Sequence, residues 1–172
     1  MHGDLKLENI LMTGDSAEVE VKIADFGLCR VLGPNESRPT DMGTLIYCAP
    51  SILLGNPCGK EVDLWALGVI IYVLLTGVYP FYSEDHAIMI ERMVCEKPDF
   101  SSEVWSNVSN DALDVCRGLL KKKKEKRFDV ETILNMQWFK EDESISTARQ
   151  KASSFPEQIE KFKALTLIKM DK

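Results

Sequence analysis

Two carboxylates, an ammonium group and an amide occur close to one another in the first part of the chain. Asp4 is followed by Lys6 and Asn9, and Asp25 comes shortly after them. In phosphoryl-transfer sites, one carboxylate orients the attacking hydroxyl group, while another carboxylate and an amide oxygen hold Mg²⁺ against phosphate groups. Residues of these types can therefore support phosphoryl chemistry, provided that the fold brings them together.

The neighbouring residues set these side chains in two signatures. The first is His2-Gly3-Asp4-Leu5-Lys6-Leu7-Glu8-Asn9 and the second is Ala24-Asp25-Phe26-Gly27. Together they resemble the catalytic loop and the metal-binding loop of eukaryotic protein kinases, H-R-D-L-x-x-x-N followed by D-F-G. Lys6, two residues after Asp4, is the form of the loop that serine/threonine kinases carry.

The resemblance continues in register over about residues 1–140. Residues 43–50 are similar to the end of a kinase activation loop, and residues 63–68 resemble the start of the family's central helix. Pro80-Phe81 follows, and Arg127 and Trp138-Phe139 then close the domain. The detail is similar to the calcium/calmodulin-regulated group of Ser/Thr kinases, with calcium-dependent protein kinases closest. The predicted fold is therefore mainly α, a kinase-like carboxy-terminal lobe with a small β-hairpin and without the amino-terminal lobe.

The resemblance implies a catalytic or cofactor-binding role for several residues of the two signatures. Asp4 would orient the Ser/Thr hydroxyl of a protein substrate, and Lys6 would neutralise charge on the moving γ-phosphoryl group. Asn9 and Asp25 would hold the Mg²⁺ that bridges the phosphates of ATP. The residues expected to bind the cofactors ATP and Mg²⁺ are therefore Lys6, Glu8, Asn9 and Asp25.

Other matching residues would position the substrate or the catalytic loop. Thr44 would contact the Asp4–Lys6 pair and help to place the substrate. Glu8 would favour a substrate with a basic residue upstream of its target hydroxyl. Asp63, at the start of a buried helix, would bind backbone amides of the catalytic loop, because a buried carboxylate needs such partners.

The chain also departs from the family pattern. Within its 172 residues there is no glycine-rich loop, strand lysine or helix glutamate of the kind that lines the other side of the nucleotide site. We therefore expect this chain alone to be poorly stable and inactive. Gly3 replaces the arginine that usually receives an activation-loop phosphate, which should make phosphorylation of Ser37 or Thr40 matter less.

Two further substitutions affect the packing of the lobe. Ser51 stands where the family has a glutamate that pairs with a later arginine, here Arg127. Losing half of a buried ion pair costs about 3–5 kcal/mol, so either Arg127 has another partner or the region is loosened. Leu7 replaces the usual proline, which we expect to be a mild change.

The sequence pattern predicts a short hairpin followed by helices. Residues 9–12 and 19–24 are rich in strand formers and read as two strands, and residues 29–42 read as irregular. Ser109 or Asn110 is the expected N-cap of one helix. Helices are expected at about residues 50–54, 60–75, 84–95, 109–120 and 129–137.

Composition excludes several classes of protein. At 45% hydrophobic residues the chain can bury one core, and a net charge of -6 argues against nucleic-acid binding. The apolar run 62–75 is too short to cross a membrane and contains Asp63. The five cysteines form no C-x-x-C pair, which favours reduced thiols and a cytoplasmic location. We interpret the lysines of residues 121–124 as a solvated helix C-terminus rather than a site for an anionic partner.

Residues 141–172 form a polar tail with one amphipathic stretch. Ile159, Phe162, Leu165 and Ile168 recur at near-helical spacing among several lysines. Such a segment resembles the autoinhibitory junction of calcium-dependent kinases and can also bind calmodulin or a calmodulin-like domain. A helix that packs on the domain, or is free in solution, fits equally well.

Two hypotheses about function follow. In the first, the chain is part of a Ser/Thr protein kinase, because the four reactive residues Asp4, Lys6, Asn9 and Asp25 are all present. In the second, it is a kinase-like scaffold or pseudokinase that binds a partner. Gly3, Ser51 and the missing half of the nucleotide site favour the second hypothesis. We prefer the first, because a decaying site is expected to lose its catalytic acids before peripheral pairs.

Overall fold

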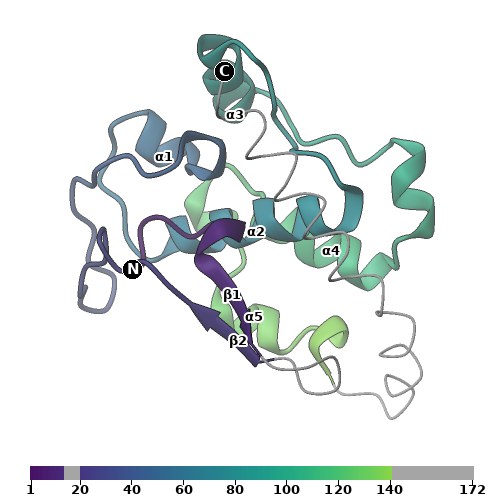
Figure 1. Cartoon of the computed structure of the whole chain (residues 1–172), viewed down its shortest axis with the longest axis horizontal. Helices are drawn as coiled ribbons and strands as arrows, with labels where there is room; N and C mark the ends of the chain where they lie inside the picture. Colours follow the sequence, from purple (N-terminus) through teal and green to yellow (C-terminus); the bar gives the residue numbers. More distant parts are fainter. Residues whose placement is uncertain (14–19, 141–172) are drawn as a thin grey trace.

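The computed structural model describes residues 1–13 and 20–140 (Figure 1). The connection between the two expected strands lies largely outside this part, and so does the whole of the tail after residue 140. The amphipathic segment with Ile159 and Phe162 therefore stays a prediction, as does the domain boundary near residue 140. The described residues are mainly helical with one two-stranded sheet, which confirms the predicted fold class.

The predicted hairpin is present. Strands β1 (Ile10–Thr13) and β2 (Glu20–Ile23) pair antiparallel, with Ile10 opposite Ile23. The Ala24 amide then donates to the Asn9 carbonyl at 2.8 Å, which continues the pairing past the strands. The hairpin therefore brings the start of the second signature back to the end of the first.

The five predicted helices are also present, with bounds within about three residues of those expected. Ser109 caps one of them by accepting from the Ala112 amide, which decides between the two expected caps. Another ends at Gly77, which has φ +76°, a left-handed conformation that glycine adopts readily. The helices are α1 (Pro50–Leu53), α2 (Glu61–Thr76), α3 (His86–Cys95), α4 (Asn110–Leu119) and α5 (Val130–Leu134).

Helix α2 is the centre of the core. It crosses the middle of the molecule, with the hairpin and α5 below it and α1 and α3 above it in Figure 1. Trp65, Val69 and Ile70 are almost fully buried, because this helix is apolar on all sides. A Cβ atom on Gly68 would lie 2.8 Å from the Leu119 Cβ atom, so glycine allows α4 to pack closely here.

The segment before α1 is irregular, as expected. Within this segment, Arg38 forms an isolated β-bridge with Cys58. The backbone groups of the two residues exchange two hydrogen bonds of 2.9 Å. All five cysteine thiols are free. Among the described residues, no helix is long and apolar enough to cross a membrane.

The lysine run after α4 differs in part from the expectation. Its other members are exposed, but Lys122 is half-buried and donates to the carbonyls of Arg92 and Met93 near the end of α3. Its ammonium lies 4.5 Å from the centre of the Phe81 ring. Burial lowers the pKa of Lys122 to about 8. Lys122 therefore caps a neighbouring helix, a contact between distant segments that charge periodicity does not indicate.

Candidate active site

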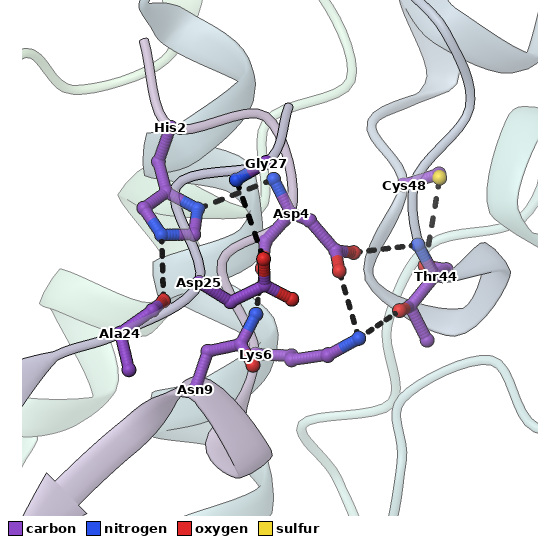
Figure 2. Close-up of polar contacts among 9 residues, drawn as sticks. All are labelled: His2, Asp4, Lys6, Asn9, Ala24, Asp25, Gly27, Thr44 and Cys48. Carbon is purple, nitrogen blue, oxygen red and sulfur yellow. Dashed lines mark hydrogen bonds and ion pairs between the residues drawn. The ribbon is translucent and has the colours of Figure 1, made fainter. Parts of the chain in front are cut away.

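Asp4, Lys6 and Thr44 form a closed polar cluster (Figure 2). One carboxylate oxygen of Asp4 accepts from Lys6 Nζ at 2.7 Å, and the other accepts from the Thr44 amide at 2.7 Å. Lys6 Nζ also donates to Thr44 Oγ1 at 2.8 Å. The ammonium thus joins the carboxylate to the hydroxyl, which is the contact expected of Thr44.

The cluster keeps Asp4 ionised. Partial burial alone would raise the pKa of its carboxyl group, but hydrogen bonds from Lys6 and Thr44 outweigh burial and lower the pKa below its ordinary value. At neutral pH this carboxylate can therefore accept a hydrogen bond from a hydroxyl group. Gly43 permits the close approach, because a Cβ atom there would lie 2.6 Å from Asp4 Oδ1. Our sequence reasoning missed Gly43, although it lies in the matched segment 43–50.

Asp63 of α2 fixes the backbone just before Asp4. Its two carboxylate oxygens accept from the amides of His2 and Gly3, at 2.7 and 2.9 Å. Gly3 has φ +86°, and a Cβ atom there would lie 3.0 Å from the Leu28 carbonyl oxygen. Glycine suits this left-handed position, so the substitution that removes a phosphate-binding arginine also relieves backbone strain.

The second signature lies against the first. The Asn9 side-chain amide donates to the Asp4 carbonyl at 2.9 Å, and His2 Nε2 lies 3.1 Å from the Ala24 carbonyl oxygen. The His2 ring also packs against Phe26, with centroids 5.4 Å apart. These contacts and the Ala24–Asn9 backbone bond bring the start of the second signature to the first, and Figure 2 draws Asp25 between Asp4 and Asn9.

Asp25 has a left-handed backbone conformation. Its φ is +63°, uncommon for any residue other than glycine, and its side chain accepts from the Gly27 amide at 3.3 Å. Asp25 is exposed, whereas Asn9 is buried. Since the Asn9 nitrogen is committed to Asp4, its amide oxygen is the atom that can act as a ligand.

These donors fit a magnesium ion. Mg²⁺ takes oxygen ligands and is usually bound by one or two protein groups, with the remaining positions filled by phosphates and water. Asp25 supplies a carboxylate and Asn9 an amide oxygen. In the described part of the chain, no three His, Cys, Asp or Glu side chains gather as an all-protein metal cage. The site is therefore suited to a metal that arrives with a phosphate compound.

Glu8 lies on the edge of the same loop. It belongs to the short 3₁₀ turn Leu7–Asn9, between Asp4 and Asn9 in sequence, and it is exposed. Because Glu8 is exposed, its carboxylate is accessible to a basic group of a peptide. Its predicted roles in cofactor binding and substrate choice stay predictions.

Arg127 hydrogen-bonds to other groups. Of the two alternatives that Ser51 left open, another partner for Arg127 or a loosened region, the structure shows the first. Its guanidinium donates to the carbonyls of Glu61, Lys121 and Lys122 and lies 5.2 Å from the centre of the Trp65 ring. Burial lowers the pKa of Arg127 to about 10. The Ser51 hydroxyl instead meets the thiol of Cys58 at 3.3 Å.

Comparison with known proteins agrees with the site. The protein kinase domain family matches residues 1–139. A probable myosin light chain kinase of Dictyostelium discoideum is 36% identical over 162 residues, which are 94% of this chain and 46% of that protein. Calcium/calmodulin-dependent protein kinase type 1B of Rattus norvegicus is 37% identical over 161 residues, 94% of this chain and 46% of that protein.

A plant kinase is similar too. Calcium-dependent protein kinase 1 of Oryza sativa subsp. japonica is 38% identical over 141 residues, 82% of this chain and 27% of that protein. The chain thus spans about half the length of the first two relatives, and less of the third. These matches confirm the resemblance to calcium/calmodulin-regulated kinases that the signatures predicted.

Proposed function

This chain belongs to the protein kinase family, and we propose that the whole protein transfers the γ-phosphoryl group of MgATP to serine or threonine hydroxyls of proteins. The observation that carries this proposal is the cluster of Asp4, Lys6 and Thr44 beside Asn9 and Asp25. Asp4, Lys6, Asn9 and Asp25, the four residues to which the resemblance assigns the reaction, are all present in the chain.

Each residue has a defined task in the reaction. Asp4 accepts the hydrogen bond of the attacking hydroxyl and takes its proton as the new oxygen–phosphorus bond forms. Lys6 stands beside Asp4 and neutralises charge on the transferred group while its bond to the leaving ADP oxygen breaks. Asn9 and Asp25 would hold Mg²⁺, which would supply positive charge to offset that of the phosphates.

We further propose that the 172 residues alone bind no MgATP. They contain no glycine-rich loop and no strand lysine of the kind that binds the phosphates. Asp25 and Phe26 are exposed. The nucleotide would therefore meet only one side of a site. A kinase-like scaffold is the second candidate, and the loss of the family's arginine at Gly3 and glutamate at Ser51 is what favours it.

The partners follow from charge. The exposed Glu8 suits a protein substrate with basic residues near its target hydroxyl. The predicted basic amphipathic segment at residues 155–170 suits calmodulin or a calmodulin-like domain. Two of the similar kinases are named for calcium or calmodulin dependence, which supports this partner.

Phosphate transfer from radiolabelled ATP tests the proposal. The full-length protein is incubated with Mg²⁺ and two peptides that differ in having arginine or alanine upstream of a serine. We expect labelled phosphoserine, preference for the arginine peptide, and loss of that preference in Glu8→Gln. A full-length protein that labels neither peptide nor any protein would support the scaffold instead.

A further inference from the structure

Two tyrosine hydroxyls meet beneath the site. The oxygens of Tyr47 and Tyr79 are 3.0 Å apart, and their rings pack edge to face with centroids separated by 5.7 Å. Tyr47 is buried, with 4% of its surface exposed, and Tyr79 is half-buried. Burial, with the neighbouring Tyr79, raises the pKa of Tyr47 well above its usual value, so this hydroxyl stays protonated.

Tyr47 is coupled directly to the catalytic cluster. It ends the 3₁₀ turn Leu45–Tyr47, and its amide donates to the Thr44 carbonyl at 3.0 Å. The Cys48 thiol donates to the same carbonyl at 3.5 Å. Thr44 in turn holds both Asp4 and Lys6, so a shift of Tyr47 would be transmitted to the catalytic groups.

Tyr47 and the catalytic loop share one core. Leu7 of that loop is buried, with 6% of its surface exposed, and belongs to the same hydrophobic cluster as Tyr47. The ring of Tyr47 is therefore held by the same packing as the loop that carries Asp4.

Tyr79 comes from a well-anchored loop. It follows the end of α2, two residues before Phe81, whose ring stacks on Trp65 at 5.7 Å with an interplanar angle of 8°. Phe81 is buried, with 3% of its surface exposed. The loop can thus act as a fixed support, and the Tyr79 hydroxyl is the group that it presents to Tyr47.

We propose that Tyr79 is a positioning residue, which holds Tyr47 and through it sets the distance between Thr44 and the Asp4–Lys6 pair. Tyr79, Tyr47 and Thr44 form one hydrogen-bonded relay from the loop after α2 to the Asp4–Lys6 pair. This inference rests on the proposed function, because it assigns the relay to the placement of a peptide substrate.

Tyr79→Phe tests the relay in the full-length protein, because it removes the hydroxyl and keeps the ring. Tyr72→Phe is the matched control, since it makes the same change at a hydroxyl that donates to the Asp99 carbonyl at 2.7 Å, outside the relay. We expect Tyr79→Phe to lower kcat/KM for a peptide by about three- to tenfold, the size expected for one neutral hydrogen bond, with the KM for ATP unchanged. Tyr47→Phe should cause a similar loss, and the double variant should lose little more. Losses in Tyr47→Phe and Tyr79→Phe that simply add would contradict a shared relay.

Hydrogen exchange of the backbone provides a readout that does not depend on activity. Tyr79→Phe should speed exchange in residues 44–48 relative to both the wild type and Tyr72→Phe. Unchanged exchange in this segment would overturn the relay, whatever the activity. If the wild type transferred no phosphate, the proposed function would fail, and the exchange comparison alone would decide whether the relay exists.

Discussion

Arg127 donates from Nη1 to the backbone carbonyl of Glu61 across 2.6 Å, which ties the segment after α4 to the first residue of α2. Two more carbonyls, those of Lys121 and Lys122, complete its hydrogen bonding. Backbone dipoles thus replace the carboxylate that the family usually supplies at the position of Ser51. The three hydrogen bonds to carbonyl groups explain how the buried guanidinium of Arg127 is stabilised without the carboxylate that the family usually supplies.

Arg127→Met should destabilise the lobe by about 2–4 kcal/mol, because it leaves these buried carbonyls without their donor. The change is measured as the shift of the urea unfolding midpoint. Lys121→Met is the control, since it makes a similar change at an exposed neighbour. Equal midpoints for the two variants would show that the carbonyl contacts contribute nothing.

Thr44→Val should lower kcat of the full-length protein by about tenfold. The change removes the hydroxyl that receives Lys6 Nζ but keeps the backbone amide that binds Asp4. The Lys6 ammonium would keep its bond to Asp4 but lose the second contact that fixes its place beside the reacting phosphoryl group. Thr44→Ser restores the hydroxyl and should recover most of the rate in the same peptide assay. A valine variant as fast as the serine variant would contradict this role.

The sequence allowed prediction of the hairpin, the five helices and the contacts of Thr44 and Asp63, because these depend on local pattern or on a motif in register. It did not indicate Tyr79. Packing brings this residue to Tyr47 from 32 positions further along the chain, and no periodicity encodes such a meeting. The partners of Arg127 were unpredictable for the same reason, since a backbone carbonyl looks alike at every residue.

Helix α5 illustrates the limit at element ends. The sequence suggested a helix over residues 129–137, but α5 stops at Leu134 and a separate 3₁₀ turn forms at Gln137–Phe139. Asp129 caps the start by accepting from the Thr132 amide at 2.7 Å. The cap is readable from the sequence, whereas the end depends on how Trp138 packs against the core.

The buried thiols should make the lobe less stable at alkaline pH. Burial raises the pKa of Cys116 to about 12 and that of Cys48 to about 11, above the value near 8.5 in an unfolded chain. Their contribution to stability is therefore complete below about pH 8.5 and is lost as pH rises toward the folded pKa. Lys122 acts in the opposite direction above pH 8.

Cys116→Ala should flatten this alkaline decline by up to about 1.4 kcal/mol per pH unit, the limit for one titrating group. The free energy of urea unfolding at pH 7.5 and 9.5 measures this decline. The contribution of Lys122 cancels in the comparison, because every variant keeps that residue. Cys29→Ala is the control, since that thiol is exposed. The idea would be wrong if both variants kept the wild-type slope.

The 172-residue chain alone should give no measurable heat when titrated with MgATP, because it offers the nucleotide one side of a site. The full-length protein, titrated in the same buffer, is the positive control. Micromolar binding by the short chain would show that these residues suffice for the nucleotide.

The role of Asp4 is the point on which the account depends most. Single-turnover transfer of the ATP γ-phosphoryl group to peptide, by full-length wild type and Asp4→Asn, measures it directly. We predict that the variant transfers phosphate about 10²- to 10⁴-fold more slowly, with its affinity for MgATP unchanged. Equal transfer rates in the two proteins would contradict the assignment of Asp4 to the reacting hydroxyl.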